Sequence, residues 1–261
     1  MKHESGQILP EARSAGSMSE AGTAARTRHA LFWAVAASLL LMLLPWLWPA
    51  LSWLAWPQVM IATLVHELGH GFAALLSGGG FESLQVYADG SGVAHTHGHD
   101  GRWQRAWIAA GGPLGPPLVA LVLFAAACRA RLARVALCLI ALLLGLALLI
   151  WVRNLVGVGL VVVCAGVTAL VAWRAPALPA QAFTCFVAVQ LCLATLSRLG
   201  DLFVRGARTG AGELASDTMQ IAGNLGGPHW FWGSAIALVS AGVLFAGLAL
   251  FLRGLGVRRG G

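Results

Sequence analysis

The chain has 261 residues, of which 58% are hydrophobic and 10% are charged, and its formal net charge is +7. A soluble domain has about 25% charged residues, so this composition excludes an ordinary soluble domain and indicates an integral membrane protein. The positive charge comes mainly from arginines in the tails and short connections. It fits anchoring against the anionic lipid bilayer, and no nucleic-acid motif accompanies it.

Residues 1–29 are rich in Gly, Ser, Ala and charge, which predicts a disordered, basic, cytoplasmic N-terminal tail. The apolar stretch after it extends to Trp56, longer than the core of a secretory signal. We therefore expect a spanning helix here, kinked or ended by Pro45 and Pro49. Residues 30–253 are predicted to form a single transmembrane domain, followed by a short basic tail over residues 254–261.

Six further apolar runs cover about 58–77, 104–128, 133–152, 155–173, 180–200 and 229–252. At about 20 residues per crossing, they predict an all-α polytopic protein with six or seven transmembrane helices, which we expect in the plasma membrane. Arginines near both ends of the chain favour inner termini and an even number of spans. The cluster of Arg129, Arg131 and Arg134 does not fit that scheme.

Two connections are polar. Residues 81–103 alternate around a D-G-S-G turn, which predicts a β-hairpin at the membrane edge. Residues 201–228 are expected to form a Gly-rich loop with a short helical piece. These connections hold most of the carboxylates outside the N-terminal tail, so a partner for buried histidines must come largely from them.

Such histidines occur in QVMIATLVHELGHGFAALLSGGG, residues 58–80, where His66, Glu67 and His70 interrupt an apolar helix. Side chains four residues apart project from one helix face, so His66 and His70 can bind a single zinc ion. Glu67 lies beside them and can act as general base on a water at the metal without being a ligand. Alternatively, the three side chains only satisfy one another, but ionisable groups inside a span are usually functional.

The chain resembles the intramembrane zinc metallopeptidases of the site-2 protease type, and more closely a compact membrane-only branch of them. HELGHGFAALLSGGGFESLQVYADGSGVAHTHG is similar to that core, and AAGGPLGPPL is similar to its Gly-Pro segment. WVRNLVG and ELASDTMQIAG are also similar, so the resemblance covers roughly residues 58–250. It implies one Zn²⁺ per chain and a membrane protein or peptide as substrate.

The resemblance also implies an aspartate as third zinc ligand, often within N-P-D-G or L-D-G, and neither string occurs here. Asp217 in SDTMQ matches the S-D segment of the branch and is the preferred ligand. Alternatively, Asp217 caps a helix, in a capping box that Gln220 closes. Asp201 is the runner-up ligand, although Arg198 and Arg205 at i−3 and i+4 favour surface pairing for it.

Two further sets of residues are candidates for the site. Arg153 and Asn154 lie between two apolar runs and either line the site or mark a helix boundary. An edge strand at 84–95 can add an extended substrate segment by β-augmentation, or else the hairpin only packs on the bundle. The candidate substrate contacts in this region are Val86, Asp89, Ser91 and His95.

The histidines of HTHGH alternate along the sequence, so on a strand they project from one face. They either bind a second metal ion there or belong to a solvated, flexible loop. They are His95, His97 and His99.

The sequence therefore predicts an intramembrane zinc metalloendopeptidase that cuts a transmembrane or membrane-proximal segment. The alternative is a non-proteolytic membrane protein that keeps the metal site for metal binding, transport or scaffolding. Glu67 favours the enzyme, because a purely metal-binding helix does not need a carboxylate there. The absence of N-P-D-G favours the alternative.

Overall fold

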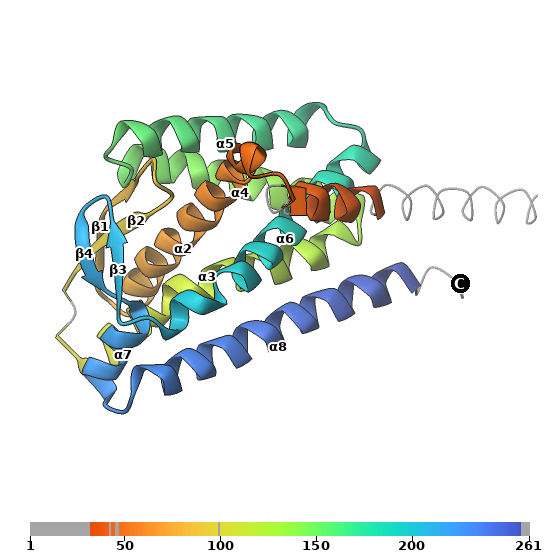
Figure 1. The fold of residues 1–261 in the computed structure, drawn as a ribbon. Helices are drawn as coiled ribbons and strands as arrows, with labels where there is room; N and C mark the ends of the chain where they lie inside the picture. Colours follow the sequence, from red (N-terminus) through yellow and green to blue (C-terminus); the bar gives the residue numbers. More distant parts are fainter. Residues whose placement is uncertain (1–31, 42, 45–46, 99, 257–261) are drawn as a thin grey trace, which may run out of the picture.

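The computed structural model describes residues 32–41, 43–44, 47–98 and 100–256 (Figure 1). Six of the described helices are long and apolar enough to cross a membrane, which confirms the predicted all-α polytopic class. They are α2 (Trp56–Leu76), α3 (Arg102–Ala127), α4 (Ala130–Ile150), α5 (Leu155–Arg174), α6 (Ala177–Ser197) and α8 (His229–Gly256).

The expected span before Trp56 is not among these six helices. In the described part of that segment, an apolar helix covers Phe32–Leu41 and a 3-10 helix, η1, covers Pro49–Leu54. Residues 43, 44 and 47 are also helical, and residue 42 and residues 45–46, with the expected kink at Pro45, lie outside the described residues, so the expected span stays a prediction. The predicted tail at residues 1–29 and the last five residues of the predicted C-terminal tail lie outside the described part of the chain.

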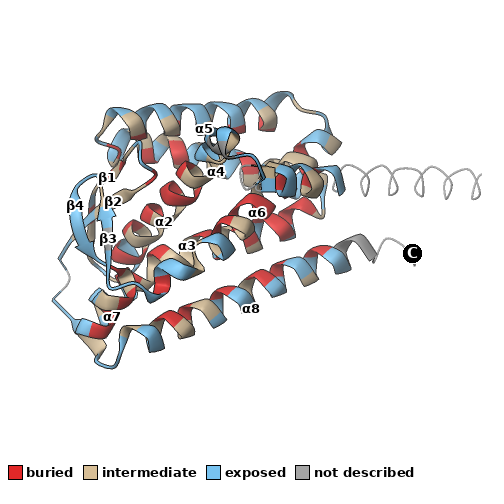
Figure 2. Ribbon diagram, viewed as in Figure 1, coloured by how far each residue is buried: buried red, intermediate tan, exposed pale blue. Residues whose placement is uncertain are grey.

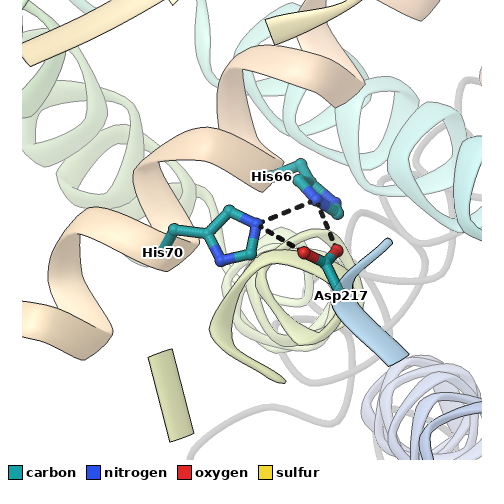
Figure 3. A group of neighbouring side chains, drawn as sticks. All are labelled: His66, His70 and Asp217. Atoms are coloured by element: carbon teal, nitrogen blue, oxygen red, sulfur yellow. Dashed lines mark hydrogen bonds and ion pairs between the residues drawn. The ribbon is translucent and has the colours of Figure 1, made fainter. Parts of the chain in front are cut away.

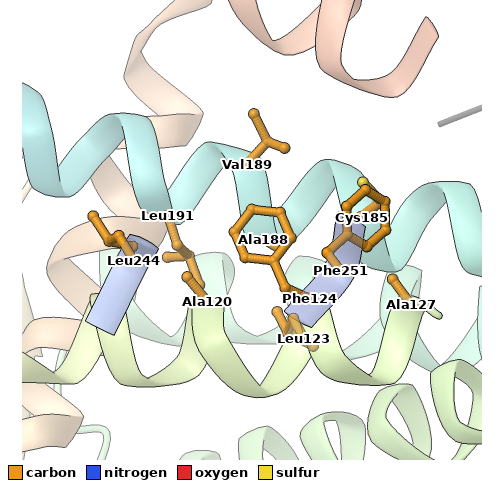
Figure 4. Close-up of a cluster of buried hydrophobic side chains, with 10 residues drawn as sticks. All are labelled: Ala120, Leu123, Phe124, Ala127, Cys185, Ala188, Val189, Leu191, Leu244 and Phe251. Atoms are coloured by element: carbon orange, nitrogen blue, oxygen red, sulfur yellow. The ribbon is translucent and has the colours of Figure 1, made fainter. Parts of the chain in front are cut away.

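The core of the bundle lies between α3, α6 and α8. Figure 2 shows that buried positions are dense on α2, α3 and α6 and sparser on α4 and α5. In the central cluster, Phe124 of α3 packs against Phe251 of α8 with ring centroids 5.7 Å apart, and Cys185 of α6 is fully buried beside them (Figure 4). Large apolar side chains such as Leu155 and Phe245 are exposed instead. Exposed apolar surface on this scale is expected where the solvent is lipid.

Glycines allow α2 and α3 to approach closely. A Cβ on Gly69 would lie 2.3 Å from the carbonyl oxygen of Gly111, and a Cβ on Gly111 would lie 2.6 Å from the carbonyl oxygen of Gly69. Small residues at a helix crossing let two backbones touch. This contact is the structural role of the AAGGPLGPPL segment, and it brings α3 against the histidine face of α2.

The predicted hairpin is formed by β1 (Gly80–Val86) and β2 (Gly92–His97), which pair antiparallel. The outer edge of β1 is covered, because Leu84 donates its N–H to the carbonyl of Trp151 (2.8 Å) and accepts from the N–H of Arg153 (3.1 Å). Within the described residues, β2 pairs only with β1. One edge of β2 is therefore open.

The second polar connection is more ordered than the sequence predicts. It contains a 3-10 helix, η2 (Leu199–Phe203), a second hairpin of β3 (Gly206–Thr209) and β4 (Gly212–Ala215), and the expected short helix, α7 (Asp217–Leu225). The two hairpins meet where Gly210 donates its N–H to the hydroxyl of Ser91 (2.9 Å). Both hairpins and α7 lie at the same end of the bundle (Figure 1).

Candidate metal centre

His66 and His70 project from one face of α2, as the four-residue spacing predicts. Their Nε2 atoms lie 3.1 Å apart. Both side chains are partly buried, with 22% and 13% of their surface exposed. Two imidazole nitrogens this close need a cation or a proton between them, because neutral lone pairs repel.

Asp217 is the carboxylate that faces both imidazoles (Figure 3). Its two oxygens lie 3.1 Å from Nε2 of His66 and 3.3 Å from Nε2 of His70. Ligand atoms held about 2.1 Å from one zinc ion at tetrahedral angles lie about 3.4 Å from one another. The three distances, of which the two to Asp217 involve different oxygens, are close to this spacing, so the three side chains are near enough to share one zinc ion. Among the described residues, this is the only group of three or more His, Cys, Asp or Glu side chains close enough to share a metal ion.

The capping-box alternative for Asp217 is wrong by one residue. Ser216 is the N-cap of α7, since its hydroxyl accepts from the N–H of Met219 (3.3 Å) and donates to the carbonyl of Val204 (2.6 Å). The Gln220 amide donates to the carbonyl of Ala215. Asp217 is the first helical residue, and its carboxylate is left free to face the histidines.

The surroundings hold the three side chains in this geometry. Nδ1 of His70 lies 2.7 Å from the carbonyl oxygen of Ile108, so Nδ1 carries a proton and Nε2 is the nitrogen that can bind a metal ion. Gly112 of α3 lies against both rings, where a Cβ would be 2.2 Å from Nε2 of His70. Burial raises the pKa of the Asp217 carboxyl, but the two imidazoles outweigh burial and lower this pKa below its usual value. The carboxylate is therefore ionised.

Glu67 is buried, with 7% of its surface exposed, and it lines a cavity of about 630 Å³ together with His66, His70 and Asp217. No hydrogen bond joins its carboxylate to any residue in the described part of the chain. Gly92 of β2 packs against its stem, where a Cβ would lie 2.7 Å from Cγ of Glu67. The walls of the cavity come from α2, α3, the end of α6, α7 and both hairpins.

Arg198, at the end of α6, connects three of the elements that form the cavity walls: α6, α2 and the turn of the first hairpin. Arg198 donates through Nη2 to the hydroxyl of Thr63 (2.9 Å) and to the carbonyl of Gly90 (3.3 Å), and Thr63 donates to the same carbonyl (2.6 Å). Thr63 precedes Glu67 by one helical turn, so this network fixes the hairpin turn beside the carboxylate. From the sequence, Arg198 is expected only as a surface partner of Asp201. Its position at the end of an apolar run is the signal for a membrane-depth role.

Asp201 lines the cavity but is exposed and does not belong to the metal-binding group. Neither Arg198 nor Arg205 forms an ion pair with it among the described residues, so the expected surface pairing is absent there. Asp217 and not Asp201 is the carboxylate that the structure brings to the histidines.

Arg153 and Asn154 are not among the residues that line the cavity. Asn154 is the N-cap of α5, as the helix-boundary alternative expects. Its side chain also holds the end of β1, because it donates to the carbonyl of Val86 (2.7 Å) and accepts from the Val86 N–H (3.2 Å). Arg153 is exposed and bonds nearby carbonyls.

The four candidate substrate contacts divide into two pairs. Asp89 and Ser91, in the turn of the first hairpin, line the cavity. The hydroxyl and backbone N–H of Ser91 lower the pKa of Asp89 below its usual value. Val86 is buried against α5, and His95 is exposed, and neither lines the cavity. Of the HTHGH histidines, His99 lies outside the described residues, so the second metal remains a prediction.

The open edge of β2 faces the same cavity. Because both backbone groups of Leu84 and of Val86 point away from β2, their partners Ala94 and Gly92 direct their own N–H and C=O groups to the open edge. Gly92 and Ala94 both line the cavity.

Comparison with known proteins agrees with this arrangement. The model of the Peptidase M50B-like family matches residues 28–247, so the match begins upstream of the resemblance seen in the sequence and includes most of the first apolar segment. No curated protein and no solved structure matches the chain. Since the family match covers most of the chain and the fold has six candidate spans, this multi-pass membrane protein belongs to the Peptidase M50B-like family of membrane metallopeptidases, as the predicted site-2 protease-type resemblance implies.

Proposed function

We propose that the chain is an intramembrane zinc metalloendopeptidase that hydrolyses a peptide bond in a transmembrane or membrane-proximal substrate segment. One observation carries the proposal: His66, His70 and Asp217 converge at zinc-ligand spacing, with Glu67 in the same cavity. Family membership supports it. We also propose that this multi-pass protein lies in the plasma membrane, with its basic N-terminal tail on the inner side.

In this mechanism His66, His70 and Asp217 hold one zinc ion. The bound ion supplies Lewis acidity, which polarises a carbonyl and lowers the pKa of water to about 7. Nδ1 of His70 keeps its proton on the Ile108 carbonyl, so Nε2 stays available as a ligand. The Glu67 carboxylate takes the proton from the attacking water at one oxygen and delivers it to the nitrogen of the leaving amine. Its lack of a hydrogen-bond partner among the described residues leaves both oxygens available for these transfers.

The open edge of β2 is proposed to hold the substrate. A helical peptide hides its carbonyls, so a membrane segment must be extended before hydrolysis. A strand added along Gly92 and Ala94 would pair with their free N–H and C=O groups by β-augmentation. Asp89 and Ser91 are proposed to contact the same strand at the hairpin turn, and the Arg198 network fixes that turn relative to Glu67.

The test compares metal content and turnover in matched variants. We expect His66→Ala, His70→Ala and Asp217→Ala to lose zinc, because each removes one of three protein ligands. Asp201→Ala is the control, since it removes an aspartate of the same cavity outside the metal-binding group. Glu67→Gln should keep zinc and lose turnover by about 10²- to 10⁴-fold.

Turnover is measured as membrane peptides that accumulate or disappear in cells that carry the wild type or Glu67→Gln. Zinc in the wild type with identical peptides in the two strains would refute the protease and favour the non-proteolytic alternative. Equal zinc content in all the ligand variants would refute the metal site itself.

A further inference from the structure

The end of the bundle opposite the candidate metal centre carries only positive charge among the described residues. Its arginines lie where α3 gives way to α4, where α5 gives way to α6, and at the end of α8. We name this surface the arginine face. It consists of Arg129, Arg131, Arg134, Arg174 and Arg253.

Contacts between these helix ends show that the arginines share one face. Arg134 of α4 donates to the carbonyl of Ala175 (2.8 Å) in the turn between α5 and α6. The thiol of Cys128, at the end of α3, lies 3.9 Å from the carbonyl oxygen of Leu250 near the end of α8. Figure 1 shows these helix ends together, away from both hairpins.

The described carboxylates lie elsewhere. They belong to α2, to the two hairpins and to the segments that flank the hairpins: Glu67, Glu82, Asp89, Asp100, Asp201, Glu213 and Asp217. At the end of the bundle that carries the hairpins, Arg208 forms an ion pair with Glu213 (3.0 Å). No arginine of the arginine face forms an ion pair within the described part of the chain. Four of the five are exposed, and Arg134 is partly buried.

The side chains next to the arginine face place it at a membrane interface. Trp173 is 72% exposed and stacks under the Arg174 guanidinium at 4.2 Å, as an interfacial tryptophan would. Leu132 and Leu252, adjacent to arginines of the face, are 44% and 58% exposed. Guanidinium groups that border lipid-exposed leucines lie at the depth of lipid headgroups. A soluble acidic partner would instead require a polar surround.

We propose that the arginine face binds the headgroups of anionic phospholipids. Arginine forms bidentate hydrogen bonds with phosphate, and this face has unpaired arginines with no carboxylate to compete for them among the described residues. The leaflet with anionic lipid then lies at this end, and the two hairpins and α7 beside the candidate metal centre lie toward the opposite leaflet (Figure 1). This inference is independent of the proposed protease activity.

The test uses the full chain in phosphatidylcholine vesicles that contain photoactivatable phosphatidylglycerol, with photoactivatable phosphatidylcholine as the uncharged comparison. Labelled peptides are mapped by mass spectrometry. We expect phosphatidylglycerol to label residues 128–135 and 170–177 more strongly than phosphatidylcholine does, and this preference to weaken in high salt. Equal labelling by the two lipids, or labelling concentrated around the hairpins, would overturn the proposal.

Substitutions of the arginines distinguish the effect of their charge from the effect of a disturbed fold. Each arginine near an anionic surface strengthens binding about fivefold, so R129Q/R131Q should reduce phosphatidylglycerol labelling of residues 128–135 by about 25-fold. R129K/R131K keeps the charge but loses the bidentate hydrogen bonds, so its labelling should lie between those of the wild type and of R129Q/R131Q. R153Q/R205Q removes two exposed arginines from the opposite end and should change nothing. A loss of labelling in the lysine variant as large as in the glutamine variant would overturn the proposal.

Discussion

The substitution Gly112→Ala tests the candidate metal centre without removing a ligand. The Cβ of alanine would lie 2.2 Å from Nε2 of His70 and 2.6 Å from Nε2 of His66. Ordinary van der Waals contact begins at 3.4 Å, so the His70 ring must move by about 1.2 Å unless α3 withdraws. The Gly69–Gly111 backbone contact, one residue away, opposes withdrawal of α3. The imidazole rings of His66 and His70 must therefore move away from their present positions.

A displacement of about 1 Å is several times the tolerance of about 0.2 Å on zinc–ligand distances. Loss of a group that only orients a ligand weakens metal binding 10- to 100-fold, so we expect a loss of at least about 100-fold when the ligand itself moves. The assay is zinc competition against a chelating dye with the purified chain. Gly159→Ala is the control, because nothing lies within 4 Å of its Cβ. Zinc affinity in Gly112→Ala equal to that of Gly159→Ala would refute the ligand assignment.

Three further predictions concern the walls of the cavity and its orientation. Gly92→Ala places a Cβ 2.7 Å from Cγ of Glu67, so turnover should fall by about 100-fold or more with zinc content unchanged, and a parallel loss of zinc would contradict this role. Ser216→Ala removes the cap of α7 and should lower the free energy of unfolding by about 1 kcal/mol and weaken zinc binding; unchanged thermal unfolding and zinc affinity would count against it. In cells, Glu213→Cys and Arg131→Cys, each in a cysteine-free chain, should react with a membrane-impermeant maleimide from opposite sides of the membrane, and reaction from one side would exclude the inferred orientation.

The spans could be predicted from the sequence because they depend on local composition. Each of the six apolar runs after residue 57 corresponds to a helix whose ends agree within a few residues. The expected span before Trp56 lies partly outside the described residues, so it stays a prediction. With six spans that start at α2, the turn after Cys128 and the end of α8 lie on one side. Arg129, Arg131 and Arg134, which did not fit the topology predicted from the sequence, then lie on the same side of the membrane as the other basic helix ends.

The second hairpin could not be predicted, because its strands carry almost no β signal. GART and GELA contain one β-branched residue between them, and strand propensity depends on β-branched and aromatic side chains. Contacts distant in sequence stabilise it instead. Gly210, in the turn of this hairpin, donates its N–H to the hydroxyl of Ser91, and it lies so close to Tyr87 that a Cβ on Gly210 would meet the Tyr87 ring. Such contacts exist only after the bundle has formed.

The same reasoning explains why spacing alone could predict two ligands of the candidate centre and not the third. His66 and His70 are placed on one face by a single helical turn, whereas Asp217 reaches them through a chain of tertiary contacts. Ser216 takes the capping position and so turns the Asp217 carboxylate inward. The far end of α7 is held against α3, where Nε of Arg105 donates to Oδ1 of Asn224 (2.7 Å). A nine-residue helix is marginal alone, so its direction, and with it the position of the third carboxylate, depends on these contacts at its two ends.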